Sequence, residues 1–484
     1  MSISSALSNA LSGLAASAAG AQTISANIAN ALTPGYAPRS LVLTTAGDAR
    51  GGGVLVRGIA RQVDPALLGA RRAADGELAA AQVRARFATD LERLAGSADE
   101  PGSLPGRLAA FEAALVAAAA RPEEEGRLQE AVHSAGALAG SLNHISRQLQ
   151  AMRGDAEAQI AQAVSNVNEQ LRQIHMLNAR IIDAANAGHP TASFEDQRRV
   201  VLDQLAAELP IRLAMRDNGA VAVYAEGGAV LLDGKPAELS FTAANAITPQ
   251  MTAEGGQLAR LAVNGRAVAP STIFGHDGAG RISALFDLRD RLAPEAQGRL
   301  DALARELVMR FQEPGLDPTR ASGDAGLFTD AGAAFDAASE TGLALRLSLD
   351  PRVDPAAGGA PWRLRDGLGA ATPGDSGDAT LLNDLAAAMA RPAAMASGGL
   401  GGTQRSLAGH VATLVARFGQ DRLAQEQLVA FATANQAGLT QAEQGMGVDT
   451  DAEMQHLLLV EQAYGANARV ISVIDDLMDT LLRI

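Results

Sequence analysis

Histidine is the side chain best suited to metal binding and to proton transfer near neutral pH, and this chain has seven of them. None lies in the H-E-x-x-H pattern that places two zinc ligands on one side of a helix, nor at another spacing typical of metal ligands. We therefore predict no metal site and no catalytic residue. We interpret most of the histidines as surface or interface side chains of helices. They are His133, His144, His175, His189, His276, His410 and His456.

Two other segments have the residue types of ligand sites without the full pattern. Asp449, Asp451 and Glu453 alternate as calcium ligands do, but the glycine and the distal glutamate of an EF-hand loop are missing. We interpret them as acidic residues at the start of a helix, where the helix dipole favours negative charge. Residues 275–280 are glycine-rich but lack the Gly-Lys-Ser/Thr of a phosphate-binding loop, so we interpret them as a turn. The sequence thus predicts no cofactor and no enzyme.

The composition favours helices that pack on one another. Of 484 residues, 47 % are hydrophobic, only 3 % are aromatic and 50 are glycine. The net charge of −14 argues against a nucleic-acid partner, and the lack of cysteine excludes disulfide bonds. The chain has no stretch of about 20 apolar residues, so we predict no membrane span. The first residues lack the basic and apolar regions of a cleaved secretory signal, so we expect none.

Both ends of the chain carry apolar residues at three- and four-residue steps, the spacing of a helix with one apolar side. Such seams are typical of coiled coils, so we expect the first and last helices to pair. Residues 2–36 contain no charged side chain. The predicted N-terminal seam is Ile3, Leu7, Leu14, Ile24 and Ile28, and the C-terminal seam is Leu457, Val460, Tyr464, Asn467, Ile471, Ile474, Met478 and Leu481.

The N-terminal helix is unusual because its other sides consist of small or neutral polar residues. A helix in contact with water normally carries charge on its outer side. We therefore infer further partners there, either other copies or subunits, or the interior of one globular domain. Asn467 is interpreted as a polar residue that sets the register of the pair, the alternative being an outward orientation. Ile471 and Ile474 are expected opposite Leu7, Leu14, Ile24 and Ile28.

The segment after the first helix contains a recognisable turn. Residues 33–36 suit a type II turn, because proline fixes the first central position and glycine takes the positive φ of the second. Together with the asparagines before it, the segment resembles the signature of the bacterial flagellar rod, hook and hook-associated axial proteins. The residues that carry the resemblance are Asn27, Asn30, Thr33, Pro34, Gly35 and Tyr36.

The other end of the chain resembles the same family. Residues 462–472 are similar to its C-terminal helix, and Asp476, Met478 and Leu481 follow at the expected places. One departure is Gly465, where members more often carry a longer polar residue. We expect this glycine to permit a close contact, at a cost of about 1 kcal/mol in helix stability.

This resemblance implies a structural adaptor that assembles at the tip of the flagellar hook and joins hook and filament through its terminal helices. The implied partners are further copies of the chain in a ring or tube, the hook protein, the next hook-associated protein toward the filament, and a cytosolic export chaperone at the C-terminal helix. The implied location is the extracellular flagellum, reached by type III export after a transient cytoplasmic stage.

Between the ends, the predicted structure changes from helix to strand and back. Residues 41–63 are predicted to form a β-hairpin or a long loop with a glycine turn at 51–53. Helices are predicted at 65–94, 107–120, 194–209, 282–311 and 379–389. An apolar seam at heptad spacing from Leu128 to Ile181 predicts a helical rod of roughly 60 residues that ends at 188. Period-two patterns with hairpin turns predict strands within 210–280, and 342–349 and 362–364 are predicted as short strands. A last long helix is predicted at 407–438 from the apolar residues Leu407, Val411, Leu414, Phe418, Leu428 and Phe431.

The predicted fold is multidomain and mainly α, with an inserted β domain. It combines paired, coiled-coil-like terminal helices, a long-helix bundle as the middle domain and an outer β-rich domain. The predicted boundaries are 1–64 and 446–484 for the terminal domain; 65–209, 281–340 and 373–445 for the middle domain; 210–280 for the β-rich insert; and 341–372 for a short β segment attached to the middle domain.

Several middle segments narrow the resemblance to the hook-associated members, among them 195–206, 227–234, 300–304 and 326–328. The nearest alternative is another axial protein, but a hook protein has a β-rich middle and rod proteins are shorter. Alternatives of other classes are a cytosolic helical scaffold or sensor with a β ligand-binding domain, and an enzyme housed in the β insert. Neither is supported by a motif.

Overall fold

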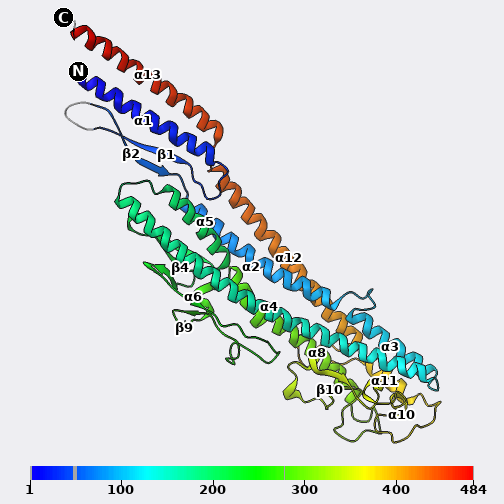
Figure 1. Cartoon of the computed structure of the whole chain (residues 1–484). Helices are drawn as coiled ribbons and strands as arrows, with labels where there is room; N and C mark the ends of the chain where they lie inside the picture. Colours follow the sequence, from blue (N-terminus) through cyan, green and yellow to red (C-terminus); the bar gives the residue numbers. More distant parts are fainter. Residues whose placement is uncertain (1–2, 47–51, 277, 483–484) are drawn as a thin grey trace.

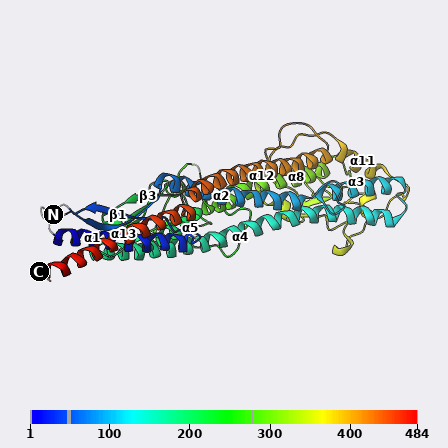
Figure 2. The same ribbon diagram turned by 90° about the horizontal axis from the view of Figure 1, so that it is seen from above.

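The computed structural model describes residues 3–46, 52–276 and 278–482, and within them the chain is elongated and mainly helical (Figure 1). Helices α1 (Ile3–Asn30) and α13 (Thr450–Leu482) lie side by side at one end, and both chain termini point the same way. The other long helices extend from this pair as a bundle (Figure 2). The chain leaves the paired termini, reverses at the far end and returns. No helix of the described part is long and apolar enough to cross a membrane.

Local capping residues define where the bundle helices begin, as predicted for the first of them. The Asp64 carboxylate accepts the N–H groups of Ala66 and Leu67, which have no partner inside the helix. Ser103 and Ser406 cap two later helices in the same way. The bundle helices are α2 (Pro65–Ala95), α3 (Leu104–Ala120), α4 (Glu125–Asn186), α5 (Ala192–Glu208), α8 (Ala293–Gln312), α11 (Thr380–Ala390) and α12 (Leu407–Gly445).

Helix α4 is the axis of the bundle. Its 62 residues span about 90 Å at the rise of an α-helix. The predicted seam is buried from Leu128 to Ile181, apart from the half-buried Met152. Helices α3, α5 and α8 and the short helix α7 (Arg281–Asp287) all pack on α4. The apolar side of α4 therefore contributes to one hydrophobic core, which continues from the far end of the bundle to the β structure.

All the sheets are small and antiparallel. A hairpin packs on α1, and the first residue of its predicted 51–53 glycine turn lies outside the described residues. The strands predicted within 210–280 are confirmed and form two sheets beside α4. The strands are β1 (Arg39–Thr45) and β2 (Val54–Arg61); β3 (Ile211–Met215), β4 (Val221–Ala225), β5 (Val230–Asp233) and β6 (Lys235–Pro236); β7 (Leu239–Ser240), β8 (Ala262–Val263) and β9 (Arg266–Ala267); and β10 (Phe328–Asp330) and β11 (Leu347–Leu349).

The two short strands predicted after residue 340 are largely wrong. Residues Leu343–Arg346 form helix α9, and only the next three residues form a strand. The reason is Asp301, whose carboxylate accepts the N–H groups of Gly342 and Ala344 at 2.8 Å each and so caps a helical turn. The other segment forms helix α10 (Arg363–Asp366). Its period-two pattern is too short to distinguish a strand from one helical turn.

Helix α12 is longer than predicted and packs differently. It continues through Gly438 to Gly445 and runs against α2. Of the apolar residues predicted for this helix, Leu407, Val411, Leu414 and Phe418 are buried. Leu428 and Phe431 are 53 % and 72 % exposed, whereas Ala432 is buried. A small residue at the contact brings two helices close together, and the larger neighbours then lie outside the contact.

A cluster of buried charges ties α4 to the helices on either side of residue 290. Arg289 and Glu157 are 0 % and 1 % exposed and form an ion pair at 2.6 Å. Arg289 also binds the Asp290 carboxylate with two N–H groups, and the second Glu157 oxygen accepts the Ala244 N–H. The helix around Arg289 is a π-helical turn, Leu288–Leu292, directly before Pro294. Such a turn suits this position because proline has no N–H for the regular helical bond.

We expect Glu157→Ala to lower the free energy of unfolding by about 3 kcal/mol, because it leaves a buried arginine short of a partner. Urea unfolding followed by far-UV circular dichroism measures this. Glu169→Ala is the matched control, since Glu169 lies on the same helix in an exposed pair with Arg172. An equal shift of the unfolding midpoint in both variants would contradict the role of the buried cluster.

Candidate functional site

Helices α1 and α13 pair antiparallel in a register that repeats every seven residues. Gly13 faces Asn467, Gly20 faces Val460 and Asn27 faces Glu453, so seven residues forward on α1 match seven backward on α13. A Cβ at residue 13 would lie 2.7 Å from the Asn467 Nδ2, which is closer than side chains approach. Glycine at this position therefore leaves room for the asparagine side chain.

The predicted seam residues lie along this pair, but not all are covered. Ile24 and Ile474 are buried, at 8 % and 7 % exposure. Ile3, Leu7, Leu14, Ile28, Leu457, Val460, Asn467 and Ile471 are half-buried, and Tyr464, Met478 and Leu481 are exposed.

Two expectations about the pair need correction. The antiparallel register brings Ile471 and Ile474 to the Leu7 end of α1, so Ile24 and Ile28 do not lie opposite them. Gly465 has no atom within 4 Å of the position of a Cβ, and the close contacts are made by the α1 glycines instead.

The asparagine that begins the turn signature is buried at the base of the pair. Asn27 is 0 % exposed and uses its whole amide. Its Nδ2 donates to the Arg39 carbonyl at 2.9 Å and to Glu453 Oε1 at 2.6 Å. Its Oδ1 accepts from the Tyr36 hydroxyl at 2.7 Å and from the Arg39 N–H at 3.0 Å. One side chain thus joins α1, the turn, β1 and α13.

The predicted type II turn is confirmed. The Tyr36 N–H donates to the Thr33 carbonyl at 3.1 Å, and Gly35 has a φ of 79°. A Cβ on Gly35 would lie 2.5 Å from Val200 Cγ2, so the turn lies directly against α5. Thr33 and Pro34 are exposed, and the Asn30 amide donates within its own helix to the Ala26 carbonyl.

Electrostatics keep Tyr36 in its neutral form. Burial raises the pKa of the hydroxyl above its ordinary value; the nearby Arg39 opposes this, and the negative charges of Asp196 and Glu453 add to it. The Arg39 guanidinium also lies over the tyrosine ring, 4.7 Å from its centre. A neutral hydroxyl is what Asn27 requires, because the bond needs a donor proton.

Ion pairs connect this base to the bundle. Arg39 and Arg61, from the two strands of the hairpin, bind the Asp196 carboxylate at 2.7 and 2.6 Å, and Arg61 also binds Glu195 at 3.2 Å. Both acids begin α5. In the next turn of α5, Arg198 donates to Asn178 Oδ1 on α4 at 2.7 Å. Burial lowers the pKa of Arg198 to about 10, with Glu195 opposing that shift.

A second connection holds the end of α12 directly before the break that leads to α13. The Glu443 carboxylate pairs with Arg71 on α2 at 2.6 Å and with Arg199 on α5. No sequence signal identifies Arg39, Arg61, Asp196 or Glu443 as connecting residues. Their partners are far away in the chain, and arginine and acidic residues usually face water.

The groups first considered for chemistry have structural roles. Asp449 caps α13 by accepting the N–H groups of Asp451 and Ala452, Asp451 is exposed, and Glu453 binds Asn27. His410 is buried against the Ala393 carbonyl. His276 and the glycines around it form a turn, except for residue 277, which lies outside the described residues. Among described residues, no three histidine or acidic side chains are grouped as metal ligands.

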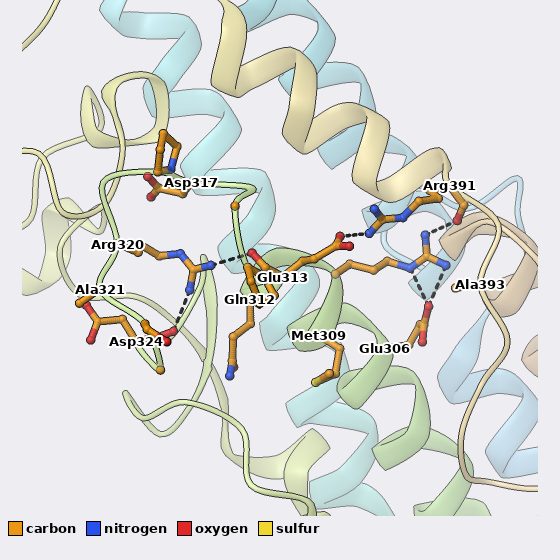
Figure 3. Close-up of a pocket in the computed structure, with 16 residues that line it drawn as sticks. Glu306, Met309, Gln312, Glu313, Asp317, Arg320, Ala321, Asp324, Arg391 and Ala393 are labelled. Atoms are coloured by element: carbon orange, nitrogen blue, oxygen red, sulfur yellow. Dashed lines mark hydrogen bonds and ion pairs between the residues drawn. The ribbon is translucent and has the colours of Figure 1, made fainter.

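A pocket of about 710 Å³ lies at the opposite end of the bundle (Figure 3). Its charged groups already have partners. Arg320 donates to the carbonyls of Asp324 and Glu313, and Arg391 pairs with the Glu313 carboxylate. Arg310 donates to the carbonyls at the end of α11. These contacts close loops around the end of α8 and offer no reactive group.

Comparison with known proteins gives matches over most of the chain. Residues 88–326 match the family model of the flagellar hook-associated protein FlgK helical domain, and residues 440–484 match that of the flagellar basal body rod FlgEFG protein C-terminal region. The chain is 24 % identical over 517 residues to flagellar hook-associated protein 1 of Bacillus subtilis, covering 98 % of this chain and 97 % of the relative.

Two more distant comparisons are shorter. The chain is 25 % identical over 258 residues to flagellar hook-associated protein 1 of Salmonella typhimurium, covering 52 % of this chain and 46 % of that protein. The solved structure of the flagellar hook junction protein FlgK from Burkholderia pseudomallei is similar with a TM-score of 0.44 and 19 % identity, covering 55 % of this chain and 47 % of that one.

The contact of Gly13 with Asn467 can be tested by disulfide trapping, because the chain has no cysteine. Gly20→Cys with Val460→Cys reports the pairing, since a Cβ at residue 20 lies 3.5 Å from Val460 Cγ2. We expect Gly13→Leu to lower the yield of this disulfide severalfold, because its side chain meets Asn467. Gly465→Ala is the control and is expected to leave the yield unchanged or raise it, since alanine stabilises a helix. Equal yields in both backgrounds would contradict the tight contact.

Proposed function

We propose that this chain, which belongs to the family of flagellar hook-associated protein 1, works as the structural adaptor at the junction of the flagellar hook and filament. The observation that carries the proposal is the pair of terminal helices. Helix α1 has no charged residue, yet α1 and α13 cover only part of each other. The uncovered parts are available for neighbouring subunits, as assembly requires.

The uncovered surface is apolar and continuous with the pair. A groove of about 630 Å³ lies between α1, α13 and the β1–β2 hairpin, and its walls include Gly20, Leu43, Val54 and Leu459. Beyond it, α13 exposes a row of large apolar side chains. A continuous patch of exposed apolar side chains is typical of an interaction site. The exposed residues of that row are Leu459, Val470, Val473, Leu477 and Leu481.

We propose that other copies of this chain, in a ring or tube, cover this surface. The hook protein and the next hook-associated protein toward the filament are the proposed neighbours on either side of that ring. The proposed route is type III export from the cytoplasm, with a cytosolic export chaperone holding the C-terminal helix beforehand. An amphipathic helix in the groove of a partner is a common mode of such capture.

The division into domains given by the sequence remains part of the proposal. Segments 1–64 and 446–484 form the axial part, and the helical segments around α4 form the middle part. Segment 210–280 adds β structure beside α4, and 341–372 is a further small part. We propose that 210–280 is the outer domain and that 341–372 is attached to the middle part. A hook or rod protein is a weaker candidate, because the model that covers such proteins matches only 440–484.

Ile474→Asp tests the assembly role. Ile474 is the only buried side chain among the described residues of α13, and a charge there is costly without a partner. We expect the variant to be exported and to keep the unfolding midpoint of the bundle, but to be absent from hook tips, which leaves filaments unattached. Electron microscopy of flagella and thermal unfolding of the purified chain measure the two effects.

Asp451→Ala is the control for this variant, since Asp451 is exposed on the first turn of the same helix. It is expected to support attached filaments and normal unfolding. Attached filaments with Ile474→Asp, or unfolding of the whole purified chain by that change, would show that α13 is not an assembly element.

The proposed chaperone contact has a separate test. Deleting residues 450–484 is expected to abolish binding of the export chaperone from the same organism, measured by isothermal titration calorimetry with the purified chains. Phe431→Ser, which changes an exposed apolar residue on α12 outside the deleted segment, is expected to leave the affinity unchanged. Unchanged binding after the deletion would refute the assignment.

A further inference from the structure

The direction of the terminal helix pair relative to the bundle depends on very few contacts. We infer that Asn27 is the residue that positions the pair, by joining both helices to the strand that anchors them on α5. The geometry supports this for the single chain. Only its consequence for assembly rests on the proposed function.

Apolar packing does not set that direction. Within the described residues, α1 and α13 pack on each other, and α1 also packs on the β1–β2 hairpin, but neither makes extensive contact with α2, α4 or α12. At the base, a pocket of about 560 Å³ lies between the turn after α1 and the break after α12. Apart from the contact of the Gly35 turn with Val200 on α5, no apolar core of the described residues continues from the pair into the bundle, and polar contacts make the remaining connection.

Asn27 is suited to this role because it connects three segments with one amide. Its two N–H groups reach Glu453 on α13 and the Arg39 carbonyl on β1, and its oxygen accepts from Arg39 N and the Tyr36 hydroxyl. Both backbone groups of Arg39 are thus fixed to α1. An aspartate would lack both donors, and an apolar residue would leave these buried groups without partners.

Arg39 carries the connection onward to the bundle. With its backbone bound to Asn27, its guanidinium pairs with Asp196 at the start of α5. Arg61 binds the same carboxylate from the neighbouring strand. A path of contacts runs from Glu453 through Asn27 and Arg39 to Asp196. Its groups are, in that order, negative, neutral, positive and negative. Every step is a hydrogen bond or ion pair between 2.6 and 3.0 Å.

The ion pairs of Glu443 hold the second chain connection between the bundle and the terminal helix pair. They do not set the angle between the two parts. These ion pairs fix the end of α12 to α2 and α5, and a short break then leads to α13, whose first residue is Thr450. A single fixed point of this kind permits rotation about it. The second fixed point, at Asn27, removes that freedom. In a ring of identical copies, each bundle would then leave the terminal helices at the same angle.

The test uses spin labels on the full-length chain, which has no cysteine of its own. Gln462→Cys on α13 and Ala73→Cys on α2 are both exposed sites, and pulsed electron–electron double resonance measures the distances between them. We expect one narrow distance peak with Asn27 in place. Asn27→Ala is expected to lose that single peak and give a broad or multiple distribution.

Three controls distinguish positioning from a general loss of structure. Asn30→Ala removes an asparagine of the same helix whose amide donates only within that helix, and it should keep the narrow peak. Glu453→Gln retains an acceptor for the Asn27 N–H and should keep it too. A second label pair, Ala73→Cys with Ala158→Cys on α4, reports the bundle alone and should not change in any variant.

The inference is overturned if Asn27→Ala keeps the narrow peak, if Asn30→Ala broadens it equally, or if the bundle pair broadens as well. Failure of the proposed function is a different result: the wild-type chain would be absent from purified hook–filament junctions, whatever the label distances are. Loss of the peak in Asn27→Ala with unchanged bundle distances supports the positioning role.

Discussion

The structure depends on one physical constraint, the apolar seam that runs along the whole of α4. A single helix of this length cannot bury its own seam, so every segment that covers part of it is held in place by that burial. Helices α3, α5, α7 and α8 and all the small sheets except the β1–β2 hairpin pack on α4. The result is a narrow, elongated bundle with one continuous core.

The surface proposed for assembly lies outside this core. Helices α1 and α13 cover one side of each other and leave apolar side chains exposed, among them Leu459 and Val473. The bundle can therefore fold while the terminal helices still await partners. Polar contacts around Asn27 and Asp196 connect the two parts, and such contacts define direction because hydrogen bonds depend on angle as well as distance.

Much of the fold could be predicted from sequence because its signals are local or periodic. The seam of α4, the cap at Asp64 and the turn at Gly35 depend on residues a few positions apart, and the structure confirms each. The wrong predictions depended on distant residues. Asp301 turns the segment after Gly342 into a helix, and on α12, which packs along α2, Ala432 is buried while its neighbour Phe431 is exposed.

By itself the sequence determined that both ends are seamed helices, that residues 33–36 form a type II turn, and that both ends resemble the flagellar axial proteins. It could not determine which polar residues meet. Asn27 and Glu453 are 426 positions apart, and their contact exists only because the chain returns along the bundle in one register. The tertiary structure decided that register, the burial of Ile474 and the path from Asn27 to Asp196. Periodicity specifies which side of a helix is apolar, whereas the identity of a partner depends on how the whole chain folds back.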